Sequence, residues 1–339
     1  MQGRGTPRSL RGVLMRIAID GMGGDHAPQE TVAGAAQAAS ELGVEAVVVG
    51  RPERVQPLLE SYPHLRFVPA SQVIGMDEHP AQAVRAKHDS SMSVCARLCK
   101  EGRADAWVSA GNSGAILAAA LFLQGRIRGV DRPALGTVLP TTGEPAYFLD
   151  VGANVDSRPE FLVQFAQMGA VYAERVLGRA RPRVGLLSNG EEEGKGDERT
   201  RDVYGRLKRL SAINFIGNVE PRDALAGRVD VVVADGFVGN LTIKMAEATA
   251  EFIFRTLRDE IPRSTLGKLG GLLIRSGVSR IRAGLDWREF GGAPLLGVDG
   301  VAVVAHGRSD ARAIKNAIRV AKQAVEAGLV GKIREAVGR

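Results

Sequence analysis

The sequence predicts an α/β fold in which a mainly parallel sheet is covered by helices on both faces. Two observations carry this prediction. Short apolar runs that suit buried strands alternate with segments of helical periodicity along the chain, giving roughly eight or nine strands. Glycine is also abundant, at 42 of 339 residues, and it clusters directly after the apolar runs, where a strand must turn tightly into a helix.

The composition limits the class of protein. The length suits one large or two ordinary domains, and an apolar fraction of 45% is normal for a globular core. A net charge of +7 and a pI of about 9.7 favour an acidic partner, such as nucleic acid, an anionic membrane, an acidic protein or a phosphorylated substrate. Only 5% of residues are aromatic and no aromatic-rich basic motif is present, which argues against nucleic acid.

Cysteine usage and the chain's first residues indicate a cytoplasmic setting. Cys95 and Cys99 stand four residues apart in a helical pattern, so we expect two buried thiols, with no disulfide and no metal site. Residues 1–14 are rich in Arg and Gly and lack the apolar core of a signal peptide. We expect them to be a disordered extension before one domain at 15–339. The longest apolar run, 115–123, is too short to span a bilayer.

The first glycine loop follows a strand predicted at residues 16–20 and precedes a helix. Its candidate anion-binding residues are Gly23, Gly24, Asp25 and His26. A dinucleotide-binding loop would read G-x-G-x-x-G, but His26 occupies the third glycine position and no acid for a ribose follows the second strand. The loop therefore argues against NAD. His26 is either a phosphate or acid–base group or a surface turn residue.

Three further loops carry polar residues after strands. Residues 111–114 follow a strand at 106–110, which itself follows a long helix predicted at 81–101. Gly111 permits close backbone approach, and Asn112 and Ser113 add donors at a helix start, although an ordinary helix cap also explains them. Residues 152–156, after a strand at 146–151, contain Asn154. The loop 189–196 carries three glutamates and Lys195, which stands between two glycines as an anion-binding candidate.

Residues 230–244 show this arrangement of strand, glycine-bearing loop and helix most clearly. An apolar run at 231–234 suits a buried strand, and Asp235 ends it. Gly239 and Asn240 form a second pair of small residues, and we expect Asn240 to cap a helix at 241–257. The free N–H groups of that helix start would bind an anion, and Lys244 would add positive charge.

Residues 251–287 depart from the α/β pattern and are predicted to form a helical protrusion, 251–288. The apolar residues Ile274, Val278, Ile281 and Leu285 fall on one helical face, and the cations Lys268, Arg275, Arg280 and Arg282 flank it. Such a stripe is typical of a membrane-surface helix or of a dimer contact, and packing against a core is the alternative. Several glycines weaken the helix prediction.

The last α/β segment contains a tight loop predicted at residues 291–297 and a strand at 301–305. His306 and Ser309 lie between that strand and a final helix at 311–326. Open α/β sheets place ligands at the carboxyl ends of their strands, which makes His306 a candidate functional residue.

The residue types in these loops favour a particular chemistry. No catalytic triad spacing, nucleophile elbow, P-loop or metal-ligand cluster is present. Several helix starts and few nucleophiles suggest an enzyme that positions an anion and lets that anion attack. The residues alone therefore indicate a transferase or another phosphate-using enzyme.

Five ordered motifs together resemble the bacterial phosphate acyltransferase family, over about residues 15–337. They are the sequences at 17–25 (IAIDGMGGD), 109–115 (SAGNSGA), 150–154 (DVGAN), 235–240 (DGFVGN) and 291–297 (GGAPLLG). Two places depart from the family pattern. Residues 187–190 read LSNG where Asn-Ile-Gly is usual, and Arg308 replaces a serine in the loop after the last strand.

The resemblance implies a function and a setting. The expected reaction transfers a long-chain acyl group from acyl carrier protein to inorganic phosphate, giving acyl phosphate for phospholipid synthesis, without a cofactor. The expected fold is a Rossmann-like α/β/α sandwich related to phosphotransacetylases and isopropylmalate-type dehydrogenases. The expected assembly is a homodimer, peripheral at the inner face of an anionic cell membrane, whose product passes to a membrane-bound glycerol-3-phosphate acyltransferase.

Our site hypothesis follows from this chemistry. Phosphate is itself a nucleophile, so the protein must supply an anion cradle, oxyanion donors and protection from water. Asn112, Asn154, Asn240 and His306 are the catalytic candidates. The phosphate and substrate candidates are Gly23, Gly24, Asp25, His26, Gly111, Ser113, Lys195, Asp235, Gly239, Lys244 and Ser309, and the membrane candidates are Lys268, Ile274, Arg275, Val278, Ile281 and Arg282. The alternatives are an NAD-linked dehydrogenase and a non-enzymatic membrane-surface scaffold.

Overall fold

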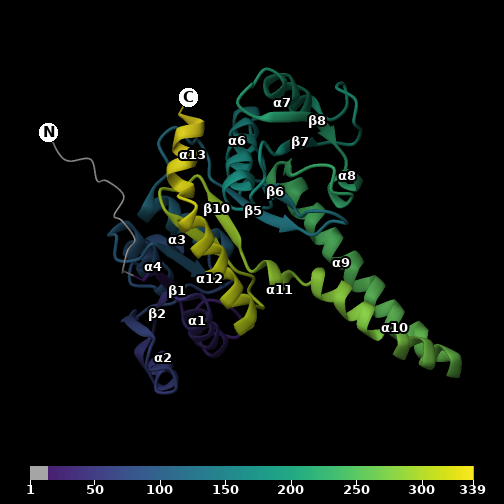
Figure 1. Ribbon diagram of the computed structural model, residues 1–339. Helices are drawn as coiled ribbons and strands as arrows, with labels where there is room; N and C mark the ends of the chain where they lie inside the picture. The colour runs from purple at the N-terminus through teal and green to yellow at the C-terminus, as the bar shows by residue number, and fades with distance from the viewer. Residues whose placement is uncertain (1–13, 339) are drawn as a thin grey trace.

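The computed structural model describes residues 14–338, so the expected N-terminal extension lies outside the described residues except for its last residue (Figure 1). Within that range the chain forms one eleven-stranded sheet in the order β3-β2-β1-β4-β11-β10-β5-β6-β9-β7-β8. Alternate residues of β1 point to opposite cores: Ile17 and Ile19 join one buried cluster and Ala18 joins another. Both faces of the sheet are therefore covered, as the sequence predicts.

The sheet has two parallel halves that run in opposite directions. One half contains β1 (Arg16–Asp20), β2 (Glu45–Gly50), β3 (Arg66–Pro69), β4 (Ala106–Ser109) and β11 (Val301–Val304), and the other contains β6 (Ala146–Leu149), β7 (Arg183–Leu187), β8 (Asn214–Val219) and β9 (Val231–Val233). Between them lie β5 (Ala134–Leu139) and β10 (Ala293–Leu296), which pair antiparallel with each other and with their outer neighbours. Three antiparallel pairings in succession reverse the strand direction.

Helices from both ends of the chain share one face of the sheet. That face is covered by α1 (Gln29–Leu42), α6 (Pro159–Arg175), α7 (Glu198–Lys208), α12 (Ala311–Glu326) and α13 (Leu329–Val337). The other face is covered by α3 (Pro80–Ala86), α4 (Ser91–Lys100) and α5 (Ser113–Ala119) over the first half of the sheet, and by α8 (Pro221–Leu225) and α9 (Gly236–Glu260) over the second. The remaining short helices are α2 (Pro52–Leu59), the π-turn η1 (Ala120–Gln124) and α11 (Trp287–Phe290).

Three sequence predictions about elements are wrong, and one strand was missed. The helix predicted at 81–101 is two helices, because Ser90 accepts a hydrogen bond from the Ser93 N–H and starts α4 anew. The helix at 115–123 gives way at residue 120 to η1. Residues 291–297 are not only a loop, since β10 lies within them, and β5 was not predicted at all. These two strands are the ones that pair antiparallel on both sides, in a chain whose pattern predicts parallel pairing.

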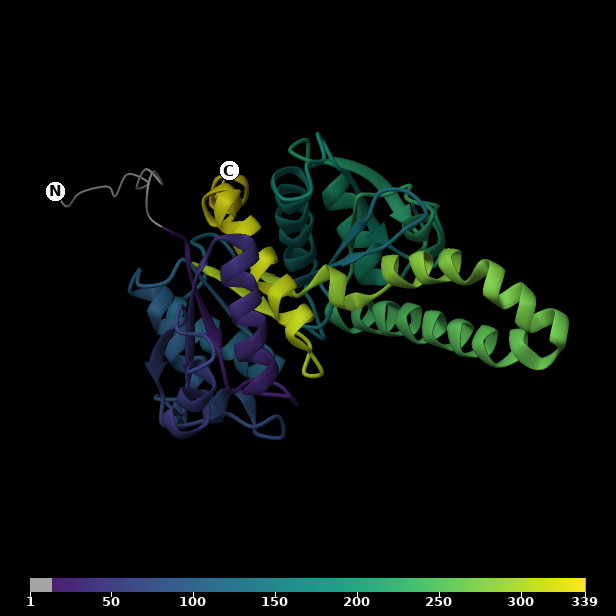
Figure 2. The ribbon, with the colours of Figure 1, turned by 60° about the horizontal axis from the view of Figure 1, so that its bottom comes forward.

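A helical hairpin extends away from the sheet (Figures 1 and 2). It consists of α9, a short turn η2 (Ile261–Arg263) and α10 (Thr265–Gly284). The glycines of α10 do not prevent a helix of 20 residues, but α10 contains no buried residue. Since isolated helices of this kind gain little from propensity alone, the hairpin depends on contacts with other surfaces.

We expect Gly34→Ala to destabilise the protein. A Cβ at this position of α1 would lie 2.6 Å from the Ala311 carbonyl oxygen and 2.6 Å from the Ile314 Cβ, so the packing of α1 on α12 would have to open. The expected loss in the free energy of unfolding is about 1–3 kcal/mol, measured by denaturant unfolding. The matched control is Gly277→Ala in α10, where a Cβ meets nothing within 4 Å and no loss is expected. Equal stability of both variants would contradict the close packing of α1 on α12.

Candidate active site

The first part of the candidate site forms where β1, β4 and β11 end. These strands are neighbours and parallel in the sheet, so their carboxyl ends bring together the loops at 21–28, 110–112 and 305–310. The backbone joins two of them directly, because the Asp25 N–H donates to the Gly307 carbonyl at 2.8 Å. The loops at 28 and 110 are 82 residues apart and those at 112 and 305 are 193 apart, and only the strand order makes them one surface.

A buried carboxylate supports this surface from below. The Ser109 hydroxyl donates to Asp20 Oδ2 at 2.7 Å and accepts from the Gly111 N–H at 3.1 Å, while the Met22 N–H donates to Asp20 Oδ1 at 3.2 Å. Burial raises the pKa of Asp20, and hydrogen bonds from Ser91 and Ser109 oppose that rise. Asp20 thus ties the β1 and β4 loops together, and sequence analysis did not identify it as a site residue.

Two glycines allow these loops to meet. A Cβ on Gly23 would lie 2.8 Å from the Gly111 nitrogen and 2.9 Å from the Ser109 hydroxyl oxygen. Gly24 has a φ of +105°, which only glycine adopts readily. Asp25 and His26 are both exposed in the same loop. His26 makes no side-chain hydrogen bond within the described part of the chain, which leaves its role open.

His306 is oriented by its own loop. Its Nδ1 accepts a hydrogen bond from the Arg308 N–H at 3.1 Å, so the neutral ring carries its proton on Nε2. The ring lies 5.0 Å from the Trp287 ring. Partial burial lowers the pKa of His306, the positive charges of Arg308 and Lys244 lower it further, and Asp25 opposes them. At neutral pH, His306 therefore presents an N–H donor and no charge.

The start of α12 is occupied by carboxylates. The Ala313 N–H donates to Asp310 Oδ1 at 2.9 Å, and the Ala311 N–H donates to Glu30 Oε2 at 2.6 Å. A phosphate at this helix start would face two negative charges, so the loop before the helix is the better anion site. There, the Ser309 hydroxyl is buried and has no hydrogen-bond partner within residues 14–338.

Asn112 is committed to holding structure. Its Oδ1 accepts from the Ala115 N–H at 3.1 Å, which caps α5, and its Nδ2 donates to the carbonyls of Met76 and Glu78 at 3.0 and 3.2 Å. Both amide hydrogens are therefore used, which leaves none for a reaction oxyanion. Ser113 remains exposed at the first turn of α5.

The second part of the site forms where β6 and β9 end, around Asp150. Five N–H groups donate to its two oxygens at 2.7–3.2 Å: the backbone groups of Leu135, Gly152, Ala153 and Asn154, and the Asn154 side chain. Burial raises the pKa of Asp150, but five donors around two oxygens fit the ionised form. The Asn154 amide donates its second hydrogen to the Pro133 carbonyl at 2.8 Å, so Asn154 also serves structure.

The start of α9 corrects the prediction for Gly239 and Asn240. The helix cap is Asp235, whose Oδ1 accepts from the Val238 N–H at 2.9 Å, and α9 begins at Gly236. The Gly239 N–H donates to the Asp235 carbonyl at 2.9 Å, so it is not free for an anion. Gly239 is required for another reason: a Cβ there would overlap the Asp150 carbonyl oxygen. Asn240 lies beside Gly152 and makes no side-chain hydrogen bond among the described residues.

Helix α9 connects the two parts of the site. Asn240, Lys244 and Glu247 are spaced by four and three residues, which places them on one helical face. The positive charge of Lys244 lowers the pKa of His306, and the charges of Arg308 and Lys244 lower the pKa of Glu247. This face of α9 therefore lies near the loop after β11, which carries His306 and Arg308. Burial raises the pKa of Glu247, and the two cations oppose that rise. Lys244 thus lies near His306, and Asn240 lies one turn earlier on the same face of α9.

A cation that the sequence analysis missed lies beside α9. Arg199 forms an ion pair with Asp235, which is buried, and donates to the Ser157 carbonyl at 3.4 Å. The pairing spans 36 residues, so no local pattern indicates it. Lys195 is exposed in the neighbouring loop, and no contact among residues 14–338 joins it to the rest of the site.

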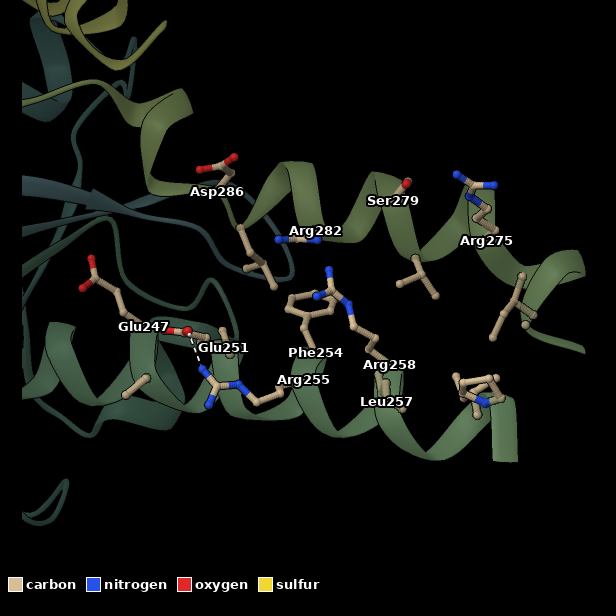
Figure 3. A pocket seen from close by; sticks show the side chains of 18 of the residues that line it. Glu247, Glu251, Phe254, Arg255, Leu257, Arg258, Arg275, Ser279, Arg282 and Asp286 are labelled. Carbon is tan, nitrogen blue, oxygen red and sulfur yellow. Dashed lines mark hydrogen bonds and ion pairs between the residues drawn. The ribbon is translucent and has the colours of Figure 1, made fainter. Parts of the chain in front are cut away.

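The predicted membrane residues are divided between two surfaces. Lys268, Ile274, Arg275, Val278 and Arg282 line an open groove of about 1120 Å³ between α9 and α10 (Figure 3). Ile281 does not line this groove and is exposed. The most exposed apolar side chains, which the prediction did not include, lie on the first half of α10: Leu266, next to the tip of the hairpin, is 82% exposed and Leu273 is 75% exposed.

Comparisons of the whole chain with solved structures support the fold. A phosphotransacetylase from Streptococcus pyogenes aligns with a TM-score of 0.60 at 17% identity, covering 97% of this chain and 95% of that one. A phosphotransacetylase from Staphylococcus aureus aligns with a TM-score of 0.59 at 16% identity, covering 93% and 94%. At such low identity these likenesses show a shared Rossmann-type α/β architecture.

Sequence comparisons show the family. A family model described as a fatty acid synthesis protein matches residues 15–332. The phosphate acyltransferase of Heliobacterium modesticaldum is 51% identical over 326 residues, which cover 95% of this chain and 97% of that protein. The phosphate acyltransferase of Nostoc punctiforme is 50% identical over 325 residues, covering 94% and 96%. This chain therefore belongs to the phosphate acyltransferase family.

Proposed function

We propose that this protein transfers an acyl group from a thioester carrier to inorganic phosphate. The observation that carries the proposal is the identity of about half of all residues, over nearly the whole chain, with proteins named phosphate acyltransferase. A 4-hydroxythreonine-4-phosphate dehydrogenase from Klebsiella pneumoniae shares the fold with a TM-score of 0.54, but at 14% identity. The dehydrogenase alternative therefore has only the architecture in its favour, and a non-enzymatic scaffold has no support among these relatives.

The reaction needs no nucleophile from the protein. A phosphate oxygen attacks the thioester carbonyl carbon, the carbonyl oxygen becomes an oxyanion, the C–S bond breaks, and the leaving thiolate takes up a proton. The protein must hold phosphate and donate hydrogen bonds to the oxyanion. In our proposal Lys244, Arg308 and the Ser309 hydroxyl hold phosphate. The unpaired Asn240 amide and the His306 Nε2–H donate to the oxyanion.

The donor and the location are finer proposals. We expect the donor to be a long-chain acyl group on acyl carrier protein, because the net charge of +7 favours an acidic partner. We also expect a cytoplasmic enzyme at the inner face of the cell membrane that passes acyl phosphate to a membrane-bound glycerol-3-phosphate acyltransferase. No helix within residues 14–338 is long and apolar enough to cross a bilayer. We propose that contact with the membrane is peripheral.

Two exposed apolar surfaces of the hairpin support membrane contact and a homodimer. Leu266, Leu269 and Leu273 are exposed on the first half of α10, where they suit contact with a membrane surface. Leu241, Met245 and Phe252 form a stripe on α9 that does not line the groove, and each is at least 54% exposed. Since monomers rarely leave such a stripe in water, we assign it to a second copy of the chain.

We expect Asn240→Ala to lower kcat about 100-fold, because one oxyanion donor is lost. The assay incubates palmitoyl-acyl carrier protein with phosphate, traps acyl phosphate as a hydroxamate and follows the free carrier thiol. Thr249→Ala, on an exposed turn of the same helix, is the matched control and should behave as wild type. Normal turnover by Asn240→Ala would remove its role, and the absence of phosphate-dependent hydroxamate from wild type would overturn the proposed function.

We expect activity to fall on the acid side as His306 becomes protonated. The folded-state pKa of His306 lies below the usual histidine value. At neutral pH its Nδ1 therefore still accepts the Arg308 N–H that orients the ring, and this hydrogen bond is lost as pH falls through the lowered pKa, because Nδ1 then carries a proton. His306→Gln keeps a donor and should lose this acid limb, while His64→Gln, at a distant exposed turn, should keep it. The measurement is kcat/KM against pH in wild type and both variants. The titration of the phosphate substrate is the same in all three assays, so a difference between them reports on the enzyme. An unchanged acid limb in His306→Gln would refute the assignment.

We expect the two apolar surfaces of the hairpin to be separable by substitution. Leu266→Asp with Leu273→Asp should abolish sedimentation with anionic liposomes and leave the dimer intact. Met245→Glu should shift the protein to monomer in analytical ultracentrifugation, because it places a charge in the α9 stripe. Leu225→Asp, at an exposed leucine on α8, is the control and should change neither property. Liposome binding by the double variant, or a dimer of Met245→Glu, would contradict the corresponding assignment.

A further inference from the structure

The groove between α9 and α10 is wide and positively charged. The turn η2 contacts both helices, but the helices themselves make almost no close backbone contacts, so their facing side chains leave open space (Figure 3). Arg258 on α9 lines this space, as do Lys268, Arg275 and Arg282 on α10, and Figure 3 shows Arg258 and Arg282 pointing toward each other between the helices. The three α10 cations are spaced by seven residues, so they form one row along the groove.

These four cations have no acid to neutralise them within the described chain. The acids that line the groove are Glu247, Glu251 and Asp286. Glu251 pairs with Arg255 at 3.0 Å and Asp286 pairs with Arg288 at 2.7 Å. The positive charges of Arg308 and Lys244 already stabilise the ionised form of Glu247. No ion pair or side-chain hydrogen bond within residues 14–338 involves the four cations. Their mutual repulsion opposes closing of the hairpin, so the groove favours a negatively charged occupant.

The groove also has an apolar component. Phe254, Leu257, Ile274, Val278 and Leu285 line it between the charged side chains. Apolar residues bordered by rows of cations complement an amphipathic helix whose apolar face is bordered by acids. Inorganic phosphate or another small anion would leave the apolar residues uncovered.

We propose that this groove binds an acidic amphipathic helix of the acyl carrier. This inference rests on the proposed function, since that function supplies a carrier protein as the acyl donor. The inner end of the groove is lined by Lys244, Trp287 and Arg308. Lys244 and Arg308 both lower the pKa of His306, so this end lies near that residue. A carrier helix lying along the groove thus ends beside the candidate active site, where its thioester must react.

The test compares two charge reversals on the same helix. Arg275→Glu reverses a charge in the groove. Arg280→Glu makes the same change on an exposed residue of α10 that does not line the groove and lies about 140° further around the helix. We expect Arg275→Glu to raise the Kd for fluorescently labelled holo-acyl carrier protein at least about ten-fold in an anisotropy titration, and Arg280→Glu to change it less than about two-fold. In steady-state assays, Arg275→Glu should raise KM for palmitoyl-acyl carrier protein and leave kcat unchanged.

Further outcomes distinguish the other occupants. Arg282→Glu should repeat the effect of Arg275→Glu, and a carrier with one helix acid changed to Lys should restore binding to the Arg275→Glu enzyme. Equal losses in the groove and control variants would overturn the proposal in favour of a general surface field. A normal Kd with a lost dimer would assign the groove to a second copy, and a normal Kd with lost liposome binding would assign it to lipid. Carrier binding does not require turnover, so an inactive wild type that still binds would count against the proposed function alone.

Discussion

The position of α9 depends on the carboxylate of Asp150. Five N–H groups surround that carboxylate and fix the loop after β6 against β5. The Asp150 carbonyl in turn lies so close to Gly239 that no side chain fits between them. One residue therefore sets both the loop and the helix that carries Asn240 and Lys244. A buried carboxylate held by this many donors costs several kcal/mol to disturb, because its partners lose their acceptor together.

The helix starts around the site are largely closed to anions by the protein's own acids. Asp235 caps α9, while Asp310 and Glu30 occupy the start of α12. The groups that remain for a ligand are the side chains of Asn240, His306 and Ser309, with the nearby cations. Such a site binds its substrate through a few directed donors, and the helix dipoles act mainly on the protein's own carboxylates. This arrangement suits a reaction in which phosphate must remain free to attack.

The hairpin brings three kinds of surface into one element. The first half of α10 carries exposed leucines, α9 carries the stripe of Leu241, Met245 and Phe252, and the groove between the helices is cationic. None of these surfaces is covered within the described part of one chain, and α10 has no buried residue. Water exposure of so much apolar area opposes folding of an isolated hairpin. In our proposals a membrane, a second copy and an acidic carrier helix each cover one surface.

Local sequence patterns were sufficient for the parallel strands and for the helix at 311–326, because apolar runs and helical periodicity are properties of neighbouring residues. They were insufficient for β5 and β10. These strands lie centrally in the sheet, yet β10 is four residues long and flanked by glycines, so it reads as a loop. The ordered motifs also indicated the family, which the comparisons confirm.

The sequence by itself determined the α/β class, the family and the residue types available for catalysis. It also contains Gly23 and Gly239, but only the fold shows that a side chain at either position would clash with the backbone of another loop. The tertiary structure decided which polar groups are free. Asn112, Asn154 and Asn240 all follow strands in the sequence. The side-chain amides of Asn112 and Asn154 donate both hydrogens to carbonyl or carboxylate oxygens of the protein, whereas the Asn240 side chain has no hydrogen-bond partner among residues 14–338. Likewise, Arg199 meets Asp235 across 36 residues. Hydrogen bonds and ion pairs of this kind depend on strand order and helix position, which no short stretch of sequence contains.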